Sequence, residues 1–463
     1  MSDVFKQYVQ NNLNLLDAVS ILHGIQCIRG TLTIQNNTYI TNQPYLIDGY
    51  LSNLVLENST IHNITSNKSV FLVVDTEMTI SNTGISNLHT SDLGNFMQLS
   101  FDSIVELVNI TYTSSTMKLL ESLSSKLHIT NLSISDISLG QYLIDYNDCQ
   151  DVTIENVTIQ NINTTQSYMM YVTRSSINLI KNITIHDIDK TVMYILNSNI
   201  SSIHNLRIYD VTDGVSIQQS SIGLIQDSQI YRSGSTSKVN GGAIYIQNSN
   251  STMLNMTFEN NIAQSGGAIS IICDSYEICQ NTITNSIFLS NIGVEQGGAI
   301  YYSFRRPELQ NITFNYNNAQ YGPNIASYPV RIVNSVNMNN LIVLSNVASG
   351  LVYQETIRML LVDYDSQTMN LISDSQIKIL PVTSGASLQG VDYSVLTNGE
   401  AEFANLQFVY SPGQNNIEYL ATCDLIDSNK ISYLDLPTNN SIDISFRYCQ
   451  PGEIVIRNQT CTV

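Results

Sequence analysis

A few carboxylates in this chain have the residue type and spacing that acid–base chemistry needs. Asp187 and Asp210 stand 23 residues apart, Asp136 belongs to the same series, and Arg207 lies between the two later aspartates. Glycoside cleavage uses two carboxyl groups, one as proton donor and the other as base or nucleophile. These residues are therefore the first candidates for an active site. The alternative, which we favour, is that the aspartates occupy turns between strands.

Other catalytic signatures are missing from the sequence. Galacturonan hydrolases combine clustered aspartates with Gly-His-Gly and Arg-x-Lys segments, but neither segment occurs, and only His23 among the six histidines adjoins a glycine. No zinc-site, phosphate-loop or nucleophile-elbow spacing occurs either. Residues 145–148 read Asp-Tyr-Asn-Asp, which lacks the ligand spacing of a calcium loop. We expect no catalytic residue, no metal and no cofactor.

Composition limits the partners of the chain. Its 463 residues carry a formal net charge of −19, and only 12% of them are charged. Nucleic acid and anionic membrane surfaces bind clustered Lys and Arg, so we expect neither as a partner. No stretch reaches the roughly 18 apolar residues of a membrane-spanning helix, so we predict no direct membrane insertion. Tryptophan is absent, but 26 tyrosines leave room for stacking on sugars.

A repeat of about 25 residues must position all of these side chains. Asn or Asp followed three residues later by Ile, Val, Phe or Tyr recurs every 22 to 30 residues. The thirteen markers are Asn36, Asn58, Asn82, Asn109, Asn131, Asn156, Asn182, Asn205, Asp227, Asn255, Asn285, Asn311 and Asn340. Five residues after seven of the markers stands a turn residue that tolerates a left-handed backbone, namely Asn63, Asn87, Asp136, Asn161, Asp187, Asp210 or Asn260.

Strands, and not helices, fit this period. The run 151–159 alternates apolar and polar residues, and three short strands with turns use one repeat and return the chain over its start. We predict an all-β fold, a right-handed parallel β-helix of the pectin-lyase-like type with about 13 coils, followed by a small β-sandwich-like domain. Ile134, Ile159, Ile185 and Ile208 should then stack inside the solenoid, and the marker asparagines should form a ladder.

The repeat is strongest between residues 241 and 317. A Gly-Gly-Ala-Ile motif recurs three times there, and each copy alternates with a Phe-x-x-Asn motif. A paired glycine suits a corner with positive φ, followed by a thin inward position where Ala stacks on Ala. The glycines are Gly241, Gly242, Gly266, Gly267, Gly297 and Gly298, and the motif asparagines are Asn261, Asn291 and Asn317.

These alternating motifs resemble the polymorphic outer membrane protein family of chlamydiae, whose repeats also occur in large surface proteins of ciliates. The strict resemblance covers residues 241–317, and the looser coil pattern extends over 31–345. It implies a parallel β-helix displayed on a cell surface, with the motif glycines and asparagines as corner and ladder residues instead of catalysts.

Asn-x-Ser/Thr triplets are dense and have two readings. They could accept glycans on an extracellular rod, or they could follow from an Asn- and Thr-rich ladder. We favour the ladder for Asn131, Asn156, Asn182, Asn205, Asn255 and the other marker positions, although Asn205 itself heads no triplet. Outside the marker column, Asn67 and Asn250 are better acceptors. The triplets begin at Asn36, Asn58, Asn63, Asn67, Asn109, Asn131, Asn156, Asn163, Asn182, Asn199, Asn250, Asn255, Asn311, Asn439 and Asn458.

The seven cysteines mark a loop and the C-terminal end. Cys273 and Cys279 lie six residues apart in an insertion that lengthens its coil, so a disulfide is predicted there. Cys449 begins a Cys-Gln-Pro-Gly-Glu segment that resembles the start of an ephrin-receptor-like module, with Cys461 following. Residues 1–30 do not resemble a secretion signal. We therefore expect a fragment of a longer, membrane-anchored chain.

Four segments follow from these patterns. They are an N-terminal segment or cap at 1–30, the β-helix at 31–345, a sandwich or meander at 346–448 and the start of a truncated Cys-rich module at 449–463. The run 398–413 resembles a strand pair of immunoglobulin-like repeats in adhesins and filamins.

Two classes of function remain open. The first is a non-enzymatic structural or adhesive protein at the cell surface or outside the cell, a monomer with glycans or other surface proteins as partners. The second is a carbohydrate-active β-helix enzyme, which predicts a groove with two carboxylates within about 10 Å of each other beside an Arg or Lys.

Overall fold

The structure is a computed structural model of the whole chain, and it divides into two compact units. The first comprises residues 1–319 and 323–325, and the second 320–322 and 326–463. The described residues are 7–9, 13–16, 25–35, 38–40, 47–90, 94–275, 278–432, 434, 441–456 and 460–462. His23, most of the predicted N-terminal segment and the triplets at Asn36, Asn439 and Asn458 lie outside them.

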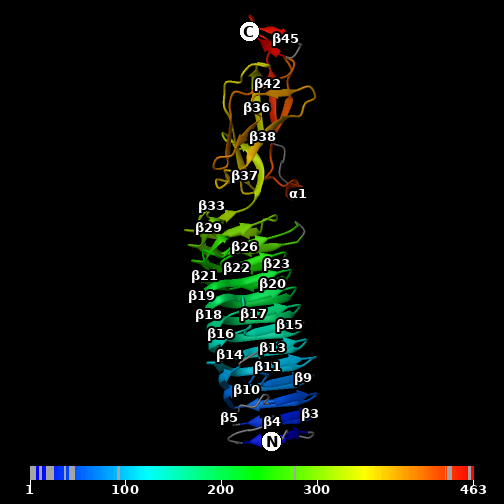
Figure 1. Cartoon of the computed structure of the whole chain (residues 1–463), viewed down its shortest axis with the longest axis vertical. Helices are drawn as coiled ribbons and strands as arrows, with labels where there is room; N and C mark the ends of the chain where they lie inside the picture. The colour runs from blue at the N-terminus through cyan, green and yellow to red at the C-terminus, as the bar shows by residue number, and fades with distance from the viewer. Residues whose placement is uncertain are drawn as a thin grey trace. The chain divides into compact units, whose positions relative to one another are not determined.

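The first unit is a parallel β-solenoid, as predicted, in which successive windings lie on one another (Figure 1). Its strands form three files. The first file consists of β1 Gln7–Val9, β3 Ile25–Ile28, β6 Ile47–Tyr50, β9 Phe71–Val74, β11 Asn95–Ser100, β13 Lys118–Leu123, β15 Ile144–Asn147, β17 Tyr168–Thr173, the last thirds of β18 Ser176–Leu196 and β19 Asn199–Gln218, β22 Ile244–Gln247, β26 Ile269–Ile272, β30 Ile300–Tyr302 and β34 Ile325–Ala326.

The other two files share several long strands that bend at a corner. The second file consists of β2 Leu13–Leu16, β4 Thr31–Gln35, β7 Asn53–Glu57, the first parts of β10 Glu77–His89, β12 Ile104–Thr113, β14 Lys126–Leu139, β16 Val152–Thr164, β18 and β19, and then β20 Ser221–Gln226, β23 Asn250–Leu254, β27 Asn281–Thr284 and β31 Glu308–Gln310. The third consists of β5 Thr38–Ile40, β8 Thr60–Thr65, the following parts of the same long strands, β21 Gln229–Ser233, β24 Thr257–Glu259, β28 Ile287–Leu289 and β32 Thr313–Asn315. Beside them, β25 Ile262–Ser265, β29 Ile292–Gln296 and β33 Asn318–Tyr321 form a small parallel sheet.

The predicted interior file is confirmed by the strand register. Ile134 is paired with Ile159, Ile159 with Ile185, and Ile185 with Ile208, and all four side chains are buried. The file continues through Ile230 into the phenylalanine repeat Phe258, Phe288 and Phe314, whose rings stack with centroids 4.9 and 5.3 Å apart. Identical residues at coil spacing therefore build one continuous core.

The solenoid has about 11 turns, compared with the approximately 13 coils that the markers suggested. Asn36 lies outside the described residues, and Asn340 lies in the second unit immediately before β36 Leu341–Val347. The parallel stacking ends at β34, so the solenoid ends near residue 325, about 20 residues before the predicted boundary at 345. The marker also occurs at Asn340 because a strand of another sheet, β36, satisfies the pattern as well as a solenoid strand does.

The second unit is a small β domain of mostly antiparallel strands. One sheet contains β35 Pro329–Asn334, β37 Ile357–Asp363 and β41 Glu400–Phe403, and a larger one contains β36, β44 Ser441–Phe446, β43 Ile417–Cys423, β38 Gln376–Pro381 and β40 Tyr393–Val395. Two further antiparallel pairs are formed by β39 Ser387–Gln389 with β42 Gln407–Val409, and by β45 Ile454–Ile456 with β46 Thr460–Thr462. The short helix α1 Ser428–Ile431 follows β43. The described part of the chain contains no helix with the length and hydrophobicity to span a membrane.

Candidate functional site

A band of four tyrosines on the outer side of the first file is the most distinctive exposed feature of the described solenoid. The register aligns Glu121 with Asp145, Asp145 with Tyr171, and Tyr171 with Tyr194. The residues before and after each of these aligned residues point inward and are buried. The side chains of Glu121, Asp145, Tyr171 and Tyr194 therefore point to solvent. Residues at equivalent positions of successive windings thus form one line on the outer surface.

A second outer line runs beside the first and completes the band. Tyr168 is aligned with Thr191, and Thr191 with Asp213. Tyr142 lies one winding before Tyr168, because the amide of the next residue, Leu143, bonds to the carbonyl of Met169. We call Tyr142, Tyr168, Tyr171 and Tyr194 the tyrosine band.

The rings of the tyrosine band stack on one another. The centroid distance is 4.9 Å between Tyr142 and Tyr171, 4.2 Å between Tyr168 and Tyr194, and 5.5 Å between Tyr171 and Tyr194. The planes of the first and last of these pairs differ by only 12° and 3°. The ring faces therefore cover one another, and the ring edges and hydroxyl groups are left toward solvent.

The hydroxyl groups of Tyr142, Tyr168 and Tyr194 stay neutral. Partial burial raises the pKa of Tyr142, Tyr168 and Tyr194 above the ordinary value, and the neighbouring tyrosines add to the effect. Tyr194 also donates a hydrogen bond to Gln218 Oε1 at 3.0 Å. A neutral phenol both donates and accepts hydrogen bonds, so the band offers a row of such groups on an apolar surface.

An ionic cluster adjoins one end of the band. Lys118 Nζ lies 3.2 Å from Glu121 Oε2 and 3.6 Å from Asp145 Oδ2, and it lies 6.0 Å from the centroid of the Tyr142 ring. Asn95 donates to the same Glu121 oxygen at 2.8 Å. Burial raises the pKa of Asp145, and Lys118 opposes that shift. We call Lys118, Glu121 and Asp145 the lower cluster.

A second ionic cluster adjoins the other end. Asp213 is buried. It accepts a hydrogen bond from the Thr191 hydroxyl at 2.7 Å and forms an ion pair with Lys238. Lys238 belongs to the loop that precedes the first Gly-Gly-Ala motif. Desolvation raises the pKa of Asp213 although Lys238 opposes that shift. We call Thr191, Asp213 and Lys238 the upper cluster.

The aspartates singled out from the sequence lie elsewhere, at corners of the solenoid. Asp136, Asp187 and Asp210 all have positive φ, between 54° and 58°. Asp210 forms two bonds of 2.6 and 2.7 Å with Arg232, and this pairing lowers its pKa. Arg207 is exposed and is aligned with Gln229 of the next winding. These residues form a corner column instead of a groove with paired carboxylates.

A second stack of aromatic rings lies on the third file. The rings of His186 and Tyr209 are 4.6 Å apart, and those of Tyr209 and Tyr231 are 4.8 Å apart. The guanidinium of Arg232 lies over the Tyr231 ring at 4.8 Å, and Asp187 contacts His186 at 2.7 Å. This outer stack is therefore already capped by charged side chains of its own.

The residues 145–148 also have partners. Asp145 belongs to the lower cluster, and Asp148 binds Arg174 through two bonds of 2.8 and 2.9 Å. The only described group of three or more metal-ligating side chains is Cys449, Glu453 and Cys461, and the two sulfurs there form a disulfide. A second disulfide joins Cys273 and Cys279 in the predicted loop.

The motif residues lie at corners and in two ladders. The marker side chains from Asn58 to Asn205 are joined head to tail by hydrogen bonds of 2.8 to 3.1 Å, and Asn255 donates to Asp227 in the same way. Inside the solenoid, Asn261 donates to Asn291, and Asn291 to Asn317, at 3.0 Å each.

The motif glycines divide into two roles. Gly241, Gly266 and Gly297 have φ between 60° and 68°. Each is followed by a glycine with no room for a side chain: a Cβ on Gly267 would lie 2.4 Å from the carbonyl oxygen of Gly298. The paired glycines thus allow one sharp turn and one close approach between windings.

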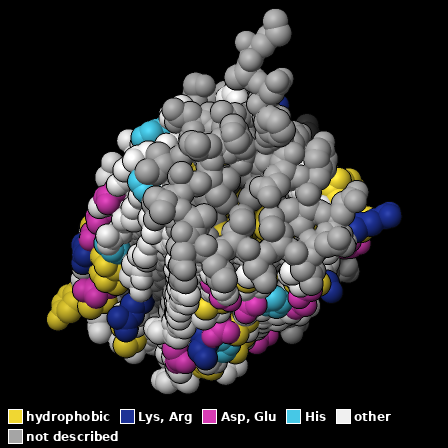
Figure 2. Space-filling view, turned by 90° about the horizontal axis from the view of Figure 1, so that it is seen from below, with side chains coloured by type: hydrophobic (Ala, Val, Ile, Leu, Met, Phe, Trp, Pro, Cys, Tyr) yellow, Lys and Arg dark blue, Asp and Glu magenta, His cyan; other side chains and the backbone are white. Residues whose placement is uncertain are grey.

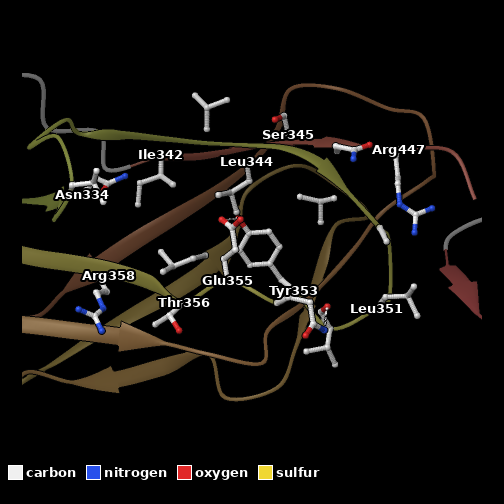
Figure 3. A pocket seen from close by; sticks show the side chains of 18 of the residues that line it. Asn334, Ile342, Leu344, Ser345, Leu351, Tyr353, Glu355, Thr356, Arg358 and Arg447 are labelled. Atoms are coloured by element: carbon white, nitrogen blue, oxygen red, sulfur yellow. Dashed lines mark hydrogen bonds between the residues drawn. The ribbon is translucent and has the colours of Figure 1, made fainter.

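The second unit contains a pocket of about 880 Å³ beside β36 (Figure 3). Tyr353 and Glu355 lie side by side in it and are joined by a hydrogen bond of 3.1 Å. Burial raises the pKa of Tyr353 to about 12, and Glu355 adds to that shift. Arg358 lines the pocket but forms an ion pair with Glu402, which does not line it. The pocket holds no cluster of free acid–base groups, so the tyrosine band is the better candidate site.

The comparisons with known proteins address the fold. Residues 119–237, which contain the tyrosine band, match the family described as "Right handed beta helix region". This part of the chain is a right-handed parallel β-helix. No curated protein matches its sequence.

Three solved structures illustrate the similarity. A periplasmic alginate epimerase is 10% identical, with a TM-score of 0.45 over 65% of this chain and 83% of that one. The A-module of an Azotobacter vinelandii mannuronan C-5 epimerase is 11% identical, with a TM-score of 0.36 over 66% and 89%. A tailspike protein of E. coli bacteriophage HK620, solved in complex with a hexasaccharide, is 10% identical, with a TM-score of 0.27 over 86% and 85%.

The sequence contained a signal for the tyrosine band that the marker search did not use. Glu121, Asp145, Tyr171 and Tyr194 recur at coil spacing, as the markers do. The search followed asparagine and the apolar residue after it, and so it followed the other two files of strands. Aligning the windings on the first file would have placed these four residues on one line.

Proposed function

We propose that the tyrosine band binds a glycan and that the chain is a non-enzymatic glycan-recognition protein. The observation that carries this proposal is the continuous stack of half-exposed tyrosines between two hydrogen-bonding clusters. Sugars present apolar C–H groups beside hydroxyl groups, and ring edges with phenol hydroxyls complement both. The band follows the solenoid axis for several windings, each of roughly 4.8 Å, which suits an extended chain of sugar units.

The distribution of Asn-x-Ser/Thr triplets also supports the first file as the face that binds the glycan. No triplet asparagine falls on a described strand of the first file, whereas the second and third files and their corners carry Asn109, Asn156, Asn163 and Asn199 among others. If the chain carries N-linked glycans, they leave the tyrosine band uncovered. We therefore propose an extracellular or cell-surface location and adhesion as the biological use. The location agrees with the surface display that the resemblance of residues 241–317 to the polymorphic outer membrane protein family implies.

The lower cluster is the specific observation that favours the alternative, a carbohydrate-active enzyme. The carboxylate oxygens of Glu121 and Asp145 lie 3.2 and 3.6 Å from one Lys118 nitrogen, so they are at most about 7 Å apart, a limit that is compatible with a glycosidase pair. However, the Lys118 ammonium contacts both carboxylates from beneath. In a glycosidase the two carboxyl groups act on the sugar instead of on a lysine, and for this reason binding without turnover is our proposal.

A binding experiment tests the proposal. The chain is titrated with oligosaccharides in a calorimeter, together with a Tyr171→Ala/Tyr194→Ala variant and a matched Tyr209→Ala/Tyr231→Ala variant from the outer stack. We expect the band variant to lose at least about tenfold in affinity, which is roughly 1.4 kcal/mol, and the control to keep it. Equal affinities of the two variants would refute the assignment of the band.

Turnover is measured on the same samples. Release of reducing ends over hours distinguishes the enzyme from the binding protein, with Asp145→Asn as the control for the carboxylate pair. Turnover that this variant abolishes would establish the enzymatic alternative.

A further inference from the structure

The charged groups around the tyrosine band are arranged so that a ligand meets carboxylates before it meets cations. In the lower cluster, the side chain of Lys118 is 5% exposed, whereas those of Glu121 and Asp145 are 42% and 23% exposed. The ammonium therefore lies beneath the two carboxylates. A ligand on the band contacts their oxygens and is screened from the lysine.

The upper cluster offers no unpaired cation either. Lys238 is in contact with Asp213, which is buried and receives a second bond from Thr191. Along the side of the band, Arg174 is held by Asp148 through two bonds, and it adjoins Thr173 on the first file. The charge of each of these cations is offset by its own carboxylate.

Lys190 adjoins Thr191 and borders the band on the side opposite Arg174. Asp189 precedes it and accepts a bond from the Thr164 amide at 3.4 Å. No ion pair joins Lys190 to Asp189. Counting both clusters, Arg174 with Asp148, Asp189 and Lys190, five carboxylates and four cations lie along the band. Seen from the N-terminal end of the solenoid, Asp, Glu, Lys and Arg side chains are also interspersed on the surface (Figure 2).

A polyanionic glycan needs unpaired cations to offset the loss of its hydration. Beside the band only Lys190 lacks a carboxylate partner among the described residues, and the chain as a whole carries a formal charge of −19, which repels such a ligand at a distance. An uncharged glycan needs hydroxyl groups, amides and carboxylate oxygens as hydrogen-bond partners. The phenols of the band, Gln218 and the exposed carboxylates are such groups.

We propose, on the basis of the glycan binding proposed above, that the ligand of the tyrosine band is an uncharged, hydroxyl-rich oligosaccharide and that the lower cluster excludes uronate and sulfated glycans. Glu121 and Asp145 are then specificity-determining residues. They hold Lys118 out of reach and place two negative groups where the anion of an acidic sugar would lie.

The test uses a glycan array with neutral, amino-sugar, uronate and sulfated members, followed by titration with a mannose hexamer and the matching mannuronate hexamer. These two probes differ in the carboxylate of each unit. We expect the array signals of the intact chain to fall on neutral members, with affinities that change less than about twofold between low and physiological salt.

A charge variant makes the test local. Glu121→Gln/Asp145→Asn removes both carboxylates from Lys118, and we expect it to gain mannuronate binding by at least about tenfold, in a salt-dependent manner. Asp187→Asn/Asp210→Asn makes the same change of net charge at the corner column and should gain none. Melting curves of both variants establish that they are folded.

The outcomes separate the two proposals. Preference of the intact chain for uronate or sulfated members would overturn the inference and leave glycan binding standing. Equal mannuronate gain in both charge variants would show a global charge effect and would also overturn it. Absence of signal from every class would overturn glycan binding and the inference together.

Discussion

The solenoid builds the same asparagine ladder twice, once inside and once at a corner. In the interior ladder, Asn291 donates to Asn317 and to the Phe258 carbonyl, and its own oxygen accepts two bonds from Asn261, all at 3.0 or 3.1 Å. In the corner ladder, Asn156 exchanges one bond with each neighbouring winding, at 3.0 Å with Asn131 and 2.8 Å with Asn182. The first ladder satisfies buried backbone groups, whereas the second is exposed.

The difference teaches that coil spacing fixes where a residue stacks but not what the stack does. An interior residue replaces water as a hydrogen-bond partner, so its loss leaves polar groups unsatisfied. An exposed residue competes with water, so its loss costs little, and its side chain remains available to a ligand. The tyrosine band and the interior phenylalanines differ in the same way. The following variants compare inside with outside.

The largest effect is expected at Ile185. Ile185→Asp loses roughly 1.5–3 kcal/mol of burial and adds an unpaired charge in the core, so its unfolding free energy should fall by several kcal/mol. His186→Asp changes the adjacent outward residue and should cost under about 1 kcal/mol. Urea denaturation of both variants measures the difference. Similar midpoints would contradict the assignment of inward and outward sides.

Glycine substitutions give the next effect. Gly267→Ala places a Cβ against three backbone atoms 2.4 to 2.5 Å away, which cannot move without shifting a neighbouring winding. We expect a loss of about 3 kcal/mol or more. Gly140→Ala meets no atom within 4 Å and should change stability by under about 0.5 kcal/mol. Melting temperatures of the pair measure this difference, and a stable Gly267→Ala protein would argue against the close approach of the windings.

The two ladders themselves should differ by a smaller amount. Asn291→Ala removes the bond to the Phe258 carbonyl and both bonds from Asn261, whose side-chain amide keeps only the Ile230 carbonyl. A loss of roughly 2–4 kcal/mol is therefore expected. Asn156→Gly removes the exposed ladder while keeping the positive φ of 56° free of strain, and should cost about 0.5–1 kcal/mol. Chemical denaturation compares them, and equal losses would mean that burial does not set the value of a ladder.

The smallest effect is a pH dependence with opposite sign at two aspartates. Burial raises the pKa of Asp213, so its contribution is fully present below the unfolded pKa of about 3.9 and is lost as pH rises through the folded pKa. Relative to Asp213→Asn, the wild-type chain should therefore lose stability from acidic to neutral pH.

Asp210 is the control for this effect. Its pKa is lowered by Arg232, so its contribution is present above the unfolded pKa and is lost as pH falls. Relative to Asp210→Asn, the wild-type chain should gain slightly in stability between acidic and neutral pH. Melting temperatures of the three proteins across this range give both signs, and a common sign would refute the role of burial at Asp213.

Much of the fold could be predicted from the sequence because each winding of a solenoid repeats the same local sequence pattern. The interior line through Ile159, Ile185 and Ile208 followed from one marker and one spacing. The end of the solenoid was placed too late because Asn340 satisfies the marker while its strand pairs in another sheet. A local pattern specifies a strand, but not the strand with which it pairs.

The candidate site was less accessible. The carboxylates chosen from the sequence, Asp187 and Asp210, share a column but lie at exposed corners. The carboxylates that meet around a lysine, Glu121 and Asp145, lack the asparagine marker. Lys118 is three residues from Glu121 and 27 from Asp145, so only the winding of the chain brings all three together.

The sequence by itself determined the period, the residues that stack and the corners that need Gly, Asn or Asp, because these depend on local backbone geometry and on the alternation of apolar side chains. The tertiary structure decided which file faces solvent with tyrosines, which cations are covered by carboxylates and where the solenoid ends. Those features depend on contacts between residues one or more windings apart, and their burial and charge exist only after the windings have stacked.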